Sequence, residues 1–334
     1  YAPFHINEQQ PSETKKNMRF VDAISLSLKQ SMEKHNNLVI MGQDIAEYGG
    51  VFKITEGFLE QFGEERVRNT PICESSIIES AYGLAINGYK SIVELQFSDF
   101  ATSGFNPIIN LLAKSFYRWA QNADVVLRMP CGAGVGAGPF HSQTNEAWFT
   151  KTPGLKVVYP AFPYDAKGLL ATAIEDSNPV MFFEHKAIYR SVYQEVPTNY
   201  YTIPFGKATI LNEGNNVSII TFGAGVHWAL SEVKNNNINA DIIDLRTLQP
   251  LDTETIFASV KKTGKVLVLQ EDTLFGGISS DISALITENC FKYLDAPVKR
   301  VASIETPIPF AKNLEEQFLP KNKLHKALED LLNY

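Results

Sequence analysis

The sequence predicts an α/β protein of two domains, each with a mainly parallel sheet flanked by helices. The chain has 334 residues, and one domain usually takes about 150. Short apolar runs alternate with segments of helical periodicity, a pattern typical of parallel strands that are buried on both faces. A stretch without helical period at residues 193–205 interrupts this alternation. We therefore predict a linker or leader at 1–17, a first domain at 18–200 and a second domain at 201–334.

The first domain opens on a predicted amphipathic helix. Phe20, Ile24, Leu28 and Met32 recur every four residues and so form one apolar stripe. The segment before them is polar, has no period and contains two prolines, which favours a linker. Apolar runs then predict strands at 38–41, 92–97, 125–129, 156–159 and 180–183. Helical periodicity predicts helices at about 77–87, 103–121 and 166–177.

The second domain repeats the alternation after the break. Its apolar runs predict strands at 217–222, 241–245, 265–269 and 298–302. The predicted helices cover about 226–236, 253–262, 279–291 and 323–332. Together the two series favour two α/β domains.

Composition and charge argue against several classes of protein. The 30 basic and 37 acidic residues give a net charge of −7, which is unfavourable for binding the nucleic-acid backbone. No apolar run approaches the ~18 residues of a membrane span, and the first residues lack the apolar region of a secretory signal. Cys73, Cys131 and Cys290 are too far apart for a CxxC motif, and this usage fits a reducing cytoplasm.

The first candidate site residue is Glu74. Ligands of open α/β sheets collect beyond the carboxyl ends of the strands, where strand–helix turns lie. Ser76 and Glu79 fit a capping box that opens a helix, so Glu74 is predicted just before that helix, at the tip of the turn. There its carboxylate could point into a crevice. The commoner alternative is a surface acid that merely suits a helix N-terminus.

The second candidate is His141. It follows residues 132–138, Gly-Ala-Gly-Val-Gly-Ala-Gly, which we call the glycine loop. The loop matches neither GxGxxG nor a Walker A motif. His141 could act as an acid, a base or a substrate ligand, or it could be satisfied by a backbone carbonyl. Phe97 and Phe100, which follow another strand, could stack on a ring or pack in the core.

Other catalytic signatures are missing from the sequence. It contains no HExxH motif, no His/Cys cluster with metal-ligand spacing and no GxSxG elbow. The residues alone therefore predict an α/β protein whose crevice contains a carboxylate and a histidine.

Ordered motifs along residues 18–334 carry a family resemblance. They are MGQD at 41–44, GGVF at 49–52, NTPICE at 69–74, ELQFSDF at 94–100, HSQ at 141–143, PGLKVV at 153–158, DLRTL at 244–248 and LDAP at 294–297. With them the chain resembles the beta subunit of the thiamine-diphosphate-dependent decarboxylase component of 2-oxo acid dehydrogenase complexes. NTPICE and the final LLNY look more like the branched-chain (2-oxoisovalerate) enzymes than the pyruvate ones.

The resemblance implies a transketolase-like pyrimidine-binding domain followed by a transketolase C-terminal domain, the latter used for assembly. Glu74 would contact the pyrimidine nitrogen of thiamine diphosphate and exchange a proton with it. His141 would face the substrate and the incoming lipoyl group. The ring would be lined by Ile72 and Gln96 and stacked on Phe100. In some relatives the loop that matches Asp176 and Asn178 binds a structural potassium ion.

The resemblance also implies partners. The motif that holds the cofactor diphosphate through magnesium belongs to the alpha subunit and is absent from this sequence. We therefore expect an alpha partner, as a separate chain or fused upstream, a second beta chain and a lipoyl-bearing transacylase core, with no nucleic acid or membrane partner. The chain alone should be nearly inactive.

The sequence departs from the family pattern at several positions. The family's usual Glu is replaced by Gln43, its Asp-Gln by Asn106-Pro107 and a proline by His185, and Gln270 stands where a histidine is common. Within the resemblance, a pyruvate or acetoin dehydrogenase beta subunit is the alternative. Outside it, the alternatives are a nucleotide-dependent oxidoreductase and a non-catalytic assembly subunit.

Overall fold

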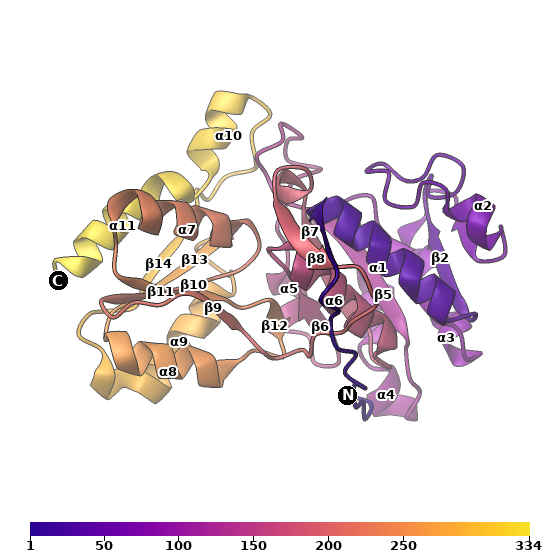
Figure 1. Cartoon of the computed structure of the whole chain (residues 1–334), viewed down its shortest axis with the longest axis horizontal. Coiled ribbons are helices and arrows are strands. Elements are labelled where there is room, and N and C mark those ends of the chain that lie inside the picture. The colour runs from indigo at the N-terminus through magenta and orange to yellow at the C-terminus, as the bar shows by residue number, and fades with distance from the viewer.

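The computed structural model describes residues 1–334 and contains two large sheets flanked by helices, together with a small two-stranded sheet (Figure 1). The first sheet has seven strands in the order β12-β6-β7-β5-β4-β2-β3, all parallel except for the β12–β6 pair. Their bounds are β2 Leu38–Gly42, β3 Val67–Asn69, β4 Lys90–Glu94, β5 Val125–Cys131, β6 Lys156–Val158, β7 Val180–His185 and β12 Thr247–Gln249. The predicted fold class is confirmed.

Helices cover both faces of this first sheet because its strands are apolar on both sides. In β2, Leu38 and Ile40 join the hydrophobic cluster that holds the predicted stripe of the first helix. Val39 and Met41 point to the other face, where Ile77 and Ile78 pack. The helices are α1 Phe20–Lys34 and α6 Pro163–Glu175, which pack on each other, α3 Glu74–Ile86, and the short α2 Phe58–Phe62 and α5 Ala147–Thr150.

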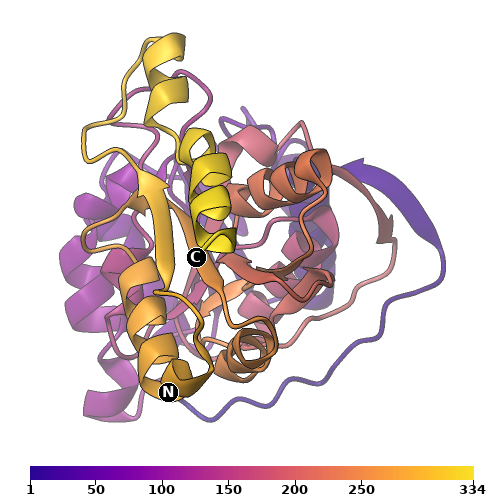
Figure 2. The same ribbon diagram turned by 90° about the vertical axis from the view of Figure 1, so that its left-hand side faces the viewer.

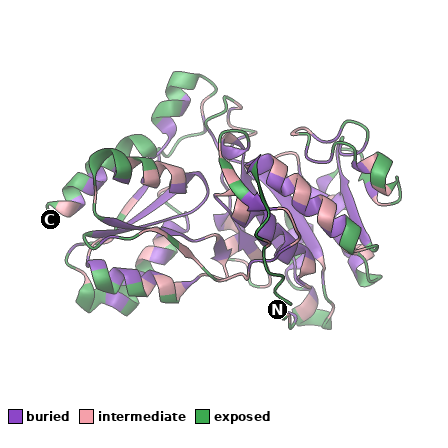
Figure 3. Cartoon of the chain, viewed as in Figure 1, coloured by how far each residue is buried: buried purple, intermediate pink, exposed green.

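The second sheet has five strands in the order β14-β13-β10-β11-β9, with only β9 antiparallel to its neighbour. The strands are β9 Thr209–Asn212, β10 Val217–Thr221, β11 Ala240–Asp244, β13 Val266–Thr273 and β14 Lys299–Ser303. The helices are α7 Ala224–Asn236, α8 Thr253–Thr263, α9 Ser279–Cys290, η4 Phe291–Tyr293, α10 Lys312–Phe318 and α11 Lys321–Leu332. Figure 3 shows buried strands under helices whose outer faces are exposed.

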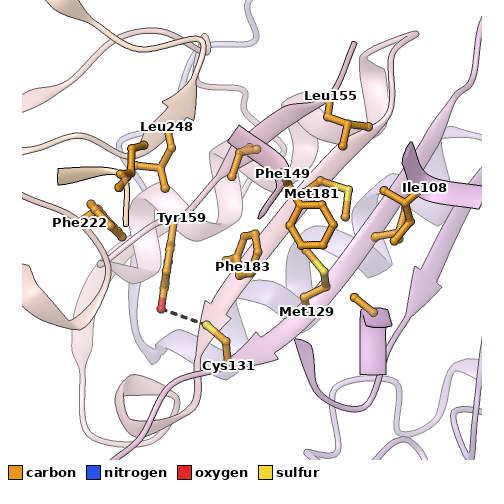
Figure 4. Close-up of a cluster of buried hydrophobic side chains, with 14 of the residues drawn as sticks. Ile108, Met129, Cys131, Phe149, Leu155, Tyr159, Met181, Phe183, Phe222 and Leu248 are labelled. Carbon is orange, nitrogen blue, oxygen red and sulfur yellow. Dashed lines mark hydrogen bonds between the residues drawn. The ribbon is translucent and has the colours of Figure 1, made fainter. Parts of the chain in front are cut away.

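The two sheets share a hydrophobic core. β12 lies in the sequence of the second domain, yet it pairs with β6 of the first sheet. Tyr159, at the end of β6, stacks on Phe183 and also contacts Phe222 of the second domain (Figure 4). The largest hydrophobic cluster, of 37 buried residues, contains side chains of both domains. The domains are therefore packed together rather than tethered.

The helix predicted at 103–121 is wrong as a single element. The structure has a 3-10 turn η1 at Ser98–Thr102, a π-helix η2 at Pro107–Leu112 and a short helix α4 at Ser115–Trp119. Pro107 has no N–H to donate, so the regular α-helical hydrogen-bond pattern is interrupted here and the chain continues as a π-helix. The left-handed conformation of Ala120 then ends α4.

The N-terminal segment runs along the outside of the first domain as an extended chain (Figure 2). The amides of Gln9 and Ser12 donate to side-chain oxygens of Thr202 and Asn199. β1 (Lys15–Arg19) then pairs antiparallel with β8 (Tyr193–Pro197), and η3 spans Lys186–Ile188. This segment is thus part of the folded domain. No helix in the structure has both the length and the apolar character needed to cross a membrane.

Candidate active site

Four neighbouring strands bring the candidate residues to one edge of the first sheet. β3, β2, β4 and β5 are adjacent and parallel, so their carboxyl ends meet there. Gln43 follows β2, Glu74 follows β3, Gln96 follows β4 and His141 follows β5. This is the edge at which open α/β sheets bind ligands.

Glu74 lies inside the helix and not before it, which corrects the sequence prediction. α3 begins at Glu74, and Cys73 precedes it without a capping side chain. An acid in the first helical turn interacts favourably with the positive end of the helix dipole, which supports this earlier start. The Glu74 side chain is only 7% exposed, and its Oε1 accepts a hydrogen bond of 3.1 Å from Nε2 of Gln43. The carboxylate therefore points inward.

A glycine brings the Gln43 segment close to its neighbours. A Cβ at Gly42 would lie 2.7 Å from the carbonyl oxygen of Glu94, so only glycine fits between β2 and β4 here. Asp44 has a left-handed backbone with φ of 57°. Its Oδ2 lies 3.4 Å from Nε2 of Gln96. Gln96 is thereby placed at the same edge as Glu74.

His141 packs against two aromatic rings that also contact each other. Its ring centroid is 4.8 Å from that of Phe97 and 5.6 Å from that of Phe100, both in edge-on geometry. Ser75, next to Glu74, donates its hydroxyl to the carbonyl oxygen of Ser103, which directly follows η1. The start of α3 therefore contacts the segment that carries Phe100.

A residue that the sequence reasoning missed holds the His141 segment in place. Asp99 Oδ1 accepts hydrogen bonds from Nε2 of Gln143 at 2.9 Å and from its backbone N–H at 3.3 Å. Ser98 Oγ donates to the carbonyl oxygen of Gln143, and Asn145 donates to that of Ser98. Asp99 lies in the matched motif ELQFSDF and Gln143 in the matched motif HSQ, so these motifs were the sequence signal that could have identified the contact.

A buried ion network supports the floor of the site. Arg128, on β5, is fully buried and pairs with Glu94 on β4 and with Glu184 on β7. Burial raises the pKa of Glu94, although the positive charge of Arg128 opposes that shift. Tyr189 donates to Glu184 at 2.6 Å. These contacts join three adjacent strands beneath the candidate residues.

The residues fit a flat heteroaromatic ring. A protonated carboxyl group can donate a hydrogen bond to a ring nitrogen, and aromatic side chains offer stacking surfaces. Ile72 leads into α3 and is 82% exposed, so its apolar side chain is free to cover a ligand or a partner chain. The structure thus brings together Glu74, Gln96, Phe100 and His141 and leaves Ile72 open to solvent.

Asp176 and Asn178 lie elsewhere, before β7 and so at the opposite edge of the sheet. The Asp176 carboxylate pairs with the ammonium of Lys156 and accepts two hydrogen bonds from Asn178. Asn178 Oδ1 accepts from the amide of Ala2 at 2.6 Å. The side chains that the resemblance assigns to a potassium ion are thus engaged here with Lys156, with Ala2 and with each other.

The cavities add one feature to the site. A cleft of about 340 Å³ opens between the domains beside the His141 segment, and Phe140, Gln143 and Asp272 contribute to its lining. Burial raises the pKa of Asp272 to about 6. The two largest hollows, of about 660 and 800 Å³, lie at the amino edge of the first sheet and in the second domain. Neither touches a candidate residue of the carboxyl edge.

Comparison with known families identifies both domains. Residues 16–192 match the transketolase pyrimidine binding domain, and residues 206–323 match the transketolase C-terminal domain. The 2-oxoisovalerate dehydrogenase subunit beta of Bacillus subtilis is 44% identical over 95% of this chain and 99% of its own length. The chain belongs to the beta-subunit family of 2-oxo acid dehydrogenases. This family is the one that the sequence motifs predicted.

Other relatives of this beta subunit carry two kinds of name. The pyruvate dehydrogenase E1 component subunit beta of Bacillus subtilis is 42% identical over 92% of this chain and 95% of its own length. The mitochondrial 2-oxoisovalerate dehydrogenase subunit beta of Dictyostelium discoideum is 43% identical over 88% of the chain and 81% of its own length. Identity alone therefore does not separate the two substrate classes.

A solved structure confirms the fold of the beta subunit. A chain described as a split gene transketolase, inactive beta4 tetramer, superposes with a TM-score of 0.77 at 21% identity. The match covers 95% of this chain and 98% of the other. At this identity the likeness shows the transketolase-like fold alone.

Proposed function

We propose that this beta subunit completes the active site of a thiamine-diphosphate-dependent enzyme that decarboxylates a branched-chain 2-oxo acid and reductively acylates a lipoyl group. The observation that carries the proposal is the buried Glu74 carboxylate, held by Gln43 at the carboxyl edge of the sheet. The branched-chain preference rests on NTPICE, on LLNY and on the 44% identical relative.

Glu74 acts as the proton-exchanging group toward the cofactor. Thiamine diphosphate, when bound, supplies the electron sink that decarboxylation of a 2-oxo acid requires. The Glu74 carboxyl would donate a hydrogen bond and a proton to the pyrimidine nitrogen. Because Gln43 is neutral and donates to Oε1, it orients the carboxyl and leaves Oε2 for the ring. Gln96 and Phe100 would line the ring, and Ile72 would become covered.

His141 acts toward the substrate. Its ring packs on Phe97 and Phe100, and Asp99 anchors the segment that follows it. An imidazole in this place can donate a proton to the carbonyl oxygen of the bound 2-oxo acid and later to a sulfur of the lipoyl group. The cleft of about 340 Å³ beside this segment gives room for substituents of the reacting groups.

The active enzyme requires other chains. The residues gathered at the edge serve the pyrimidine end, and the sequence holds no motif for the magnesium-bound diphosphate. An alpha subunit would supply it, in an assembly of two alpha and two beta chains that acts with a lipoyl-bearing transacylase core. The 42% identical relative supports pyruvate dehydrogenase as the second candidate.

Reconstitution decides between the substrates. The chain is co-purified with its alpha partner, and decarboxylation of 2-oxoisovalerate and pyruvate is assayed with thiamine diphosphate and magnesium. We expect a higher kcat/KM for 2-oxoisovalerate. A higher value for pyruvate would establish the second candidate, and no turnover of any 2-oxo acid by a cofactor-saturated assembly would overturn the proposed function.

A further inference from the structure

We propose that the second domain positions His141, through the carboxylates of Glu271 and Glu315, which bind the backbone amides of the glycine loop. The inference rests on the proposed role of His141 and extends it: a domain expected to serve assembly also holds the catalytic loop. The loop connects β5 to His141, and the two acids belong to β13 and α10.

Glu315 binds the middle of the loop. Its Oε1 accepts the N–H of Gly134 at 2.8 Å, and the N–H of Gly136 lies 3.0 and 3.1 Å from its two oxygens. The side chain is only 2% exposed although it belongs to a short helix at the surface. Figure 1 shows α10 beside the loop that follows β5. The carboxylate is therefore directed into the loop and not into solvent.

Glu271 binds the start of the loop and links it to β7. Its Oε1 accepts the N–H of Ala133 at 2.7 Å, and its Oε2 lies 2.6 Å from Nε2 of His185. The His185 ring occupies the space of a side chain at Gly132, where a Cβ would lie 2.2 Å from Nε2. His185 is one of the departures from the family pattern, and the structure shows that its partner is Glu271.

Apolar contacts cover both ends of the loop. A Cβ at Gly138 would lie 2.2 Å from the ring of Phe310, so this ring rests directly on the loop backbone. Ala133 packs in a buried cluster with Ile308, Phe318 and Leu319. All four contact residues outside the loop lie at 308–319. The segment that ends in α10 therefore covers the loop along its length.

The loop needs such external support. Gly132, Gly134, Gly136 and Gly138 all have positive φ, a conformation that glycine reaches easily and also leaves easily. Hydrogen bonds to a carboxylate are stronger than those between neutral groups, so the two acids select one loop conformation. Since the His141 N–H donates to the carbonyl oxygen of Gly138, at 3.4 Å, the position of the loop determines that of the histidine.

The test uses the assembled enzyme with Glu315→Ala, Glu315→Gln and the control Glu316→Gln, which changes the exposed neighbour on the same helix. Hydrogen exchange is followed in peptides covering residues 132–141, and kcat and KM are measured for decarboxylation with an artificial acceptor and for lipoyl acylation. We expect at least about tenfold faster exchange of Gly134 and Gly136 in Glu315→Ala, a smaller effect in Glu315→Gln and none in the control.

The kinetic expectation separates positioning from mere stability. Glu315→Ala should lower kcat for lipoyl acylation about tenfold with little change in cofactor affinity. The kcat of Glu315→Gln should lie between those of Glu315→Ala and the wild type. Unchanged exchange, or faster exchange with unchanged kcat, would overturn the inference. If Glu315→Ala does not fold, Glu315→Gln provides the same comparison. Hydrogen exchange is measured without turnover, so it tests the contact of Glu315 with the loop even if the proposed reaction is wrong. A wrong proposed function would be recognised separately, because the wild-type assembly would decarboxylate no 2-oxo acid.

Discussion

Glu74 combines two features in one carboxylate. It begins a helix, where a negative charge is stabilised, and it is almost fully removed from solvent. The single side-chain donor to it is the amide of Gln43, which carries no charge. The residue is therefore held in one orientation while an oxygen stays available to a ligand.

The change Glu74→Gln keeps the shape of this side chain and removes its ability to exchange a proton. We expect the reconstituted variant to assemble normally and to lose at least about 100-fold in kcat, because general acid–base catalysis typically contributes 10²–10⁴-fold. Glu79→Gln, at an exposed position of the same helix, is the matched control. Wild-type turnover by the Glu74 variant would refute the assigned role.

Asp272 gives the folded chain a pH-dependent stability. Burial raises its pKa from 3.8 to about 6, so its ionised form is less favourable in the folded than in the unfolded chain. Its destabilising effect develops as the pH rises from about 4 to 6 and persists above that range. The difference in unfolding free energy between Asp272→Asn and the wild type should therefore grow in favour of the variant by up to about 3 kcal/mol as the pH rises from about 4 to about 7.

Denaturant unfolding at both pH values measures this gain. Asp281→Asn, an exposed acid on α9, serves as the control and should show no such pH-dependent difference. An Asp272→Asn difference that is constant with pH would contradict the burial argument.

At the scale of elements, the glycine loop shows how glycine can be required by contact as well as by conformation. Gly132 has φ of 90°, and the His185 ring fills the space of a Cβ. Gly276 has a similar φ of 78° but nothing within 4 Å of a Cβ. Comparing alanine substitutions at Gly132 and Gly276 therefore distinguishes the cost of a left-handed backbone from the cost of a steric clash.

Gly132→Ala should destabilise the chain by about 2–4 kcal/mol, since it adds a clash to the strained backbone. Gly276→Ala should cost only about 1 kcal/mol, from the backbone alone. Thermal unfolding midpoints of the two variants provide the comparison. Equal losses would mean that the loop moves away from His185 without cost.

Elements whose side chains repeat regularly were predictable, and contacts between distant segments were not. The alternation of β2 between two clusters and the stripe of α1 follow from apolar spacing alone. The π-helix after Pro107 was missed because apolar periodicity does not register the loss of a backbone donor. Glu74 and His141 were found from strand ends and motifs, but Glu315 is 179 residues from Gly136 and has no local signal.

At the scale of the whole molecule, large apolar side chains remain on the surface of the single chain. Ile72, Tyr117, Phe275 and Phe291 are each more than 70% exposed. Such side chains become favourable when a partner covers them. In the proposed assembly, partner chains would cover some of them.

We therefore expect the isolated chain to show no measurable decarboxylation, and equimolar alpha subunit to restore it. Light scattering should report two chains of each kind in the active species. A purified beta chain that decarboxylates 2-oxo acids alone would contradict the proposal that the alpha subunit is required.

β12 has a consequence for any attempt to separate the two domains. The strand pairs with β6 through only Thr247 and Gln249, but it forms the last strand of the first sheet. A fragment cut near residue 200 would leave β6 as an unprotected edge with free backbone donors and acceptors, a known route to aggregation. The second half of the polypeptide thus shields the first from self-association, whatever it contributes to catalysis.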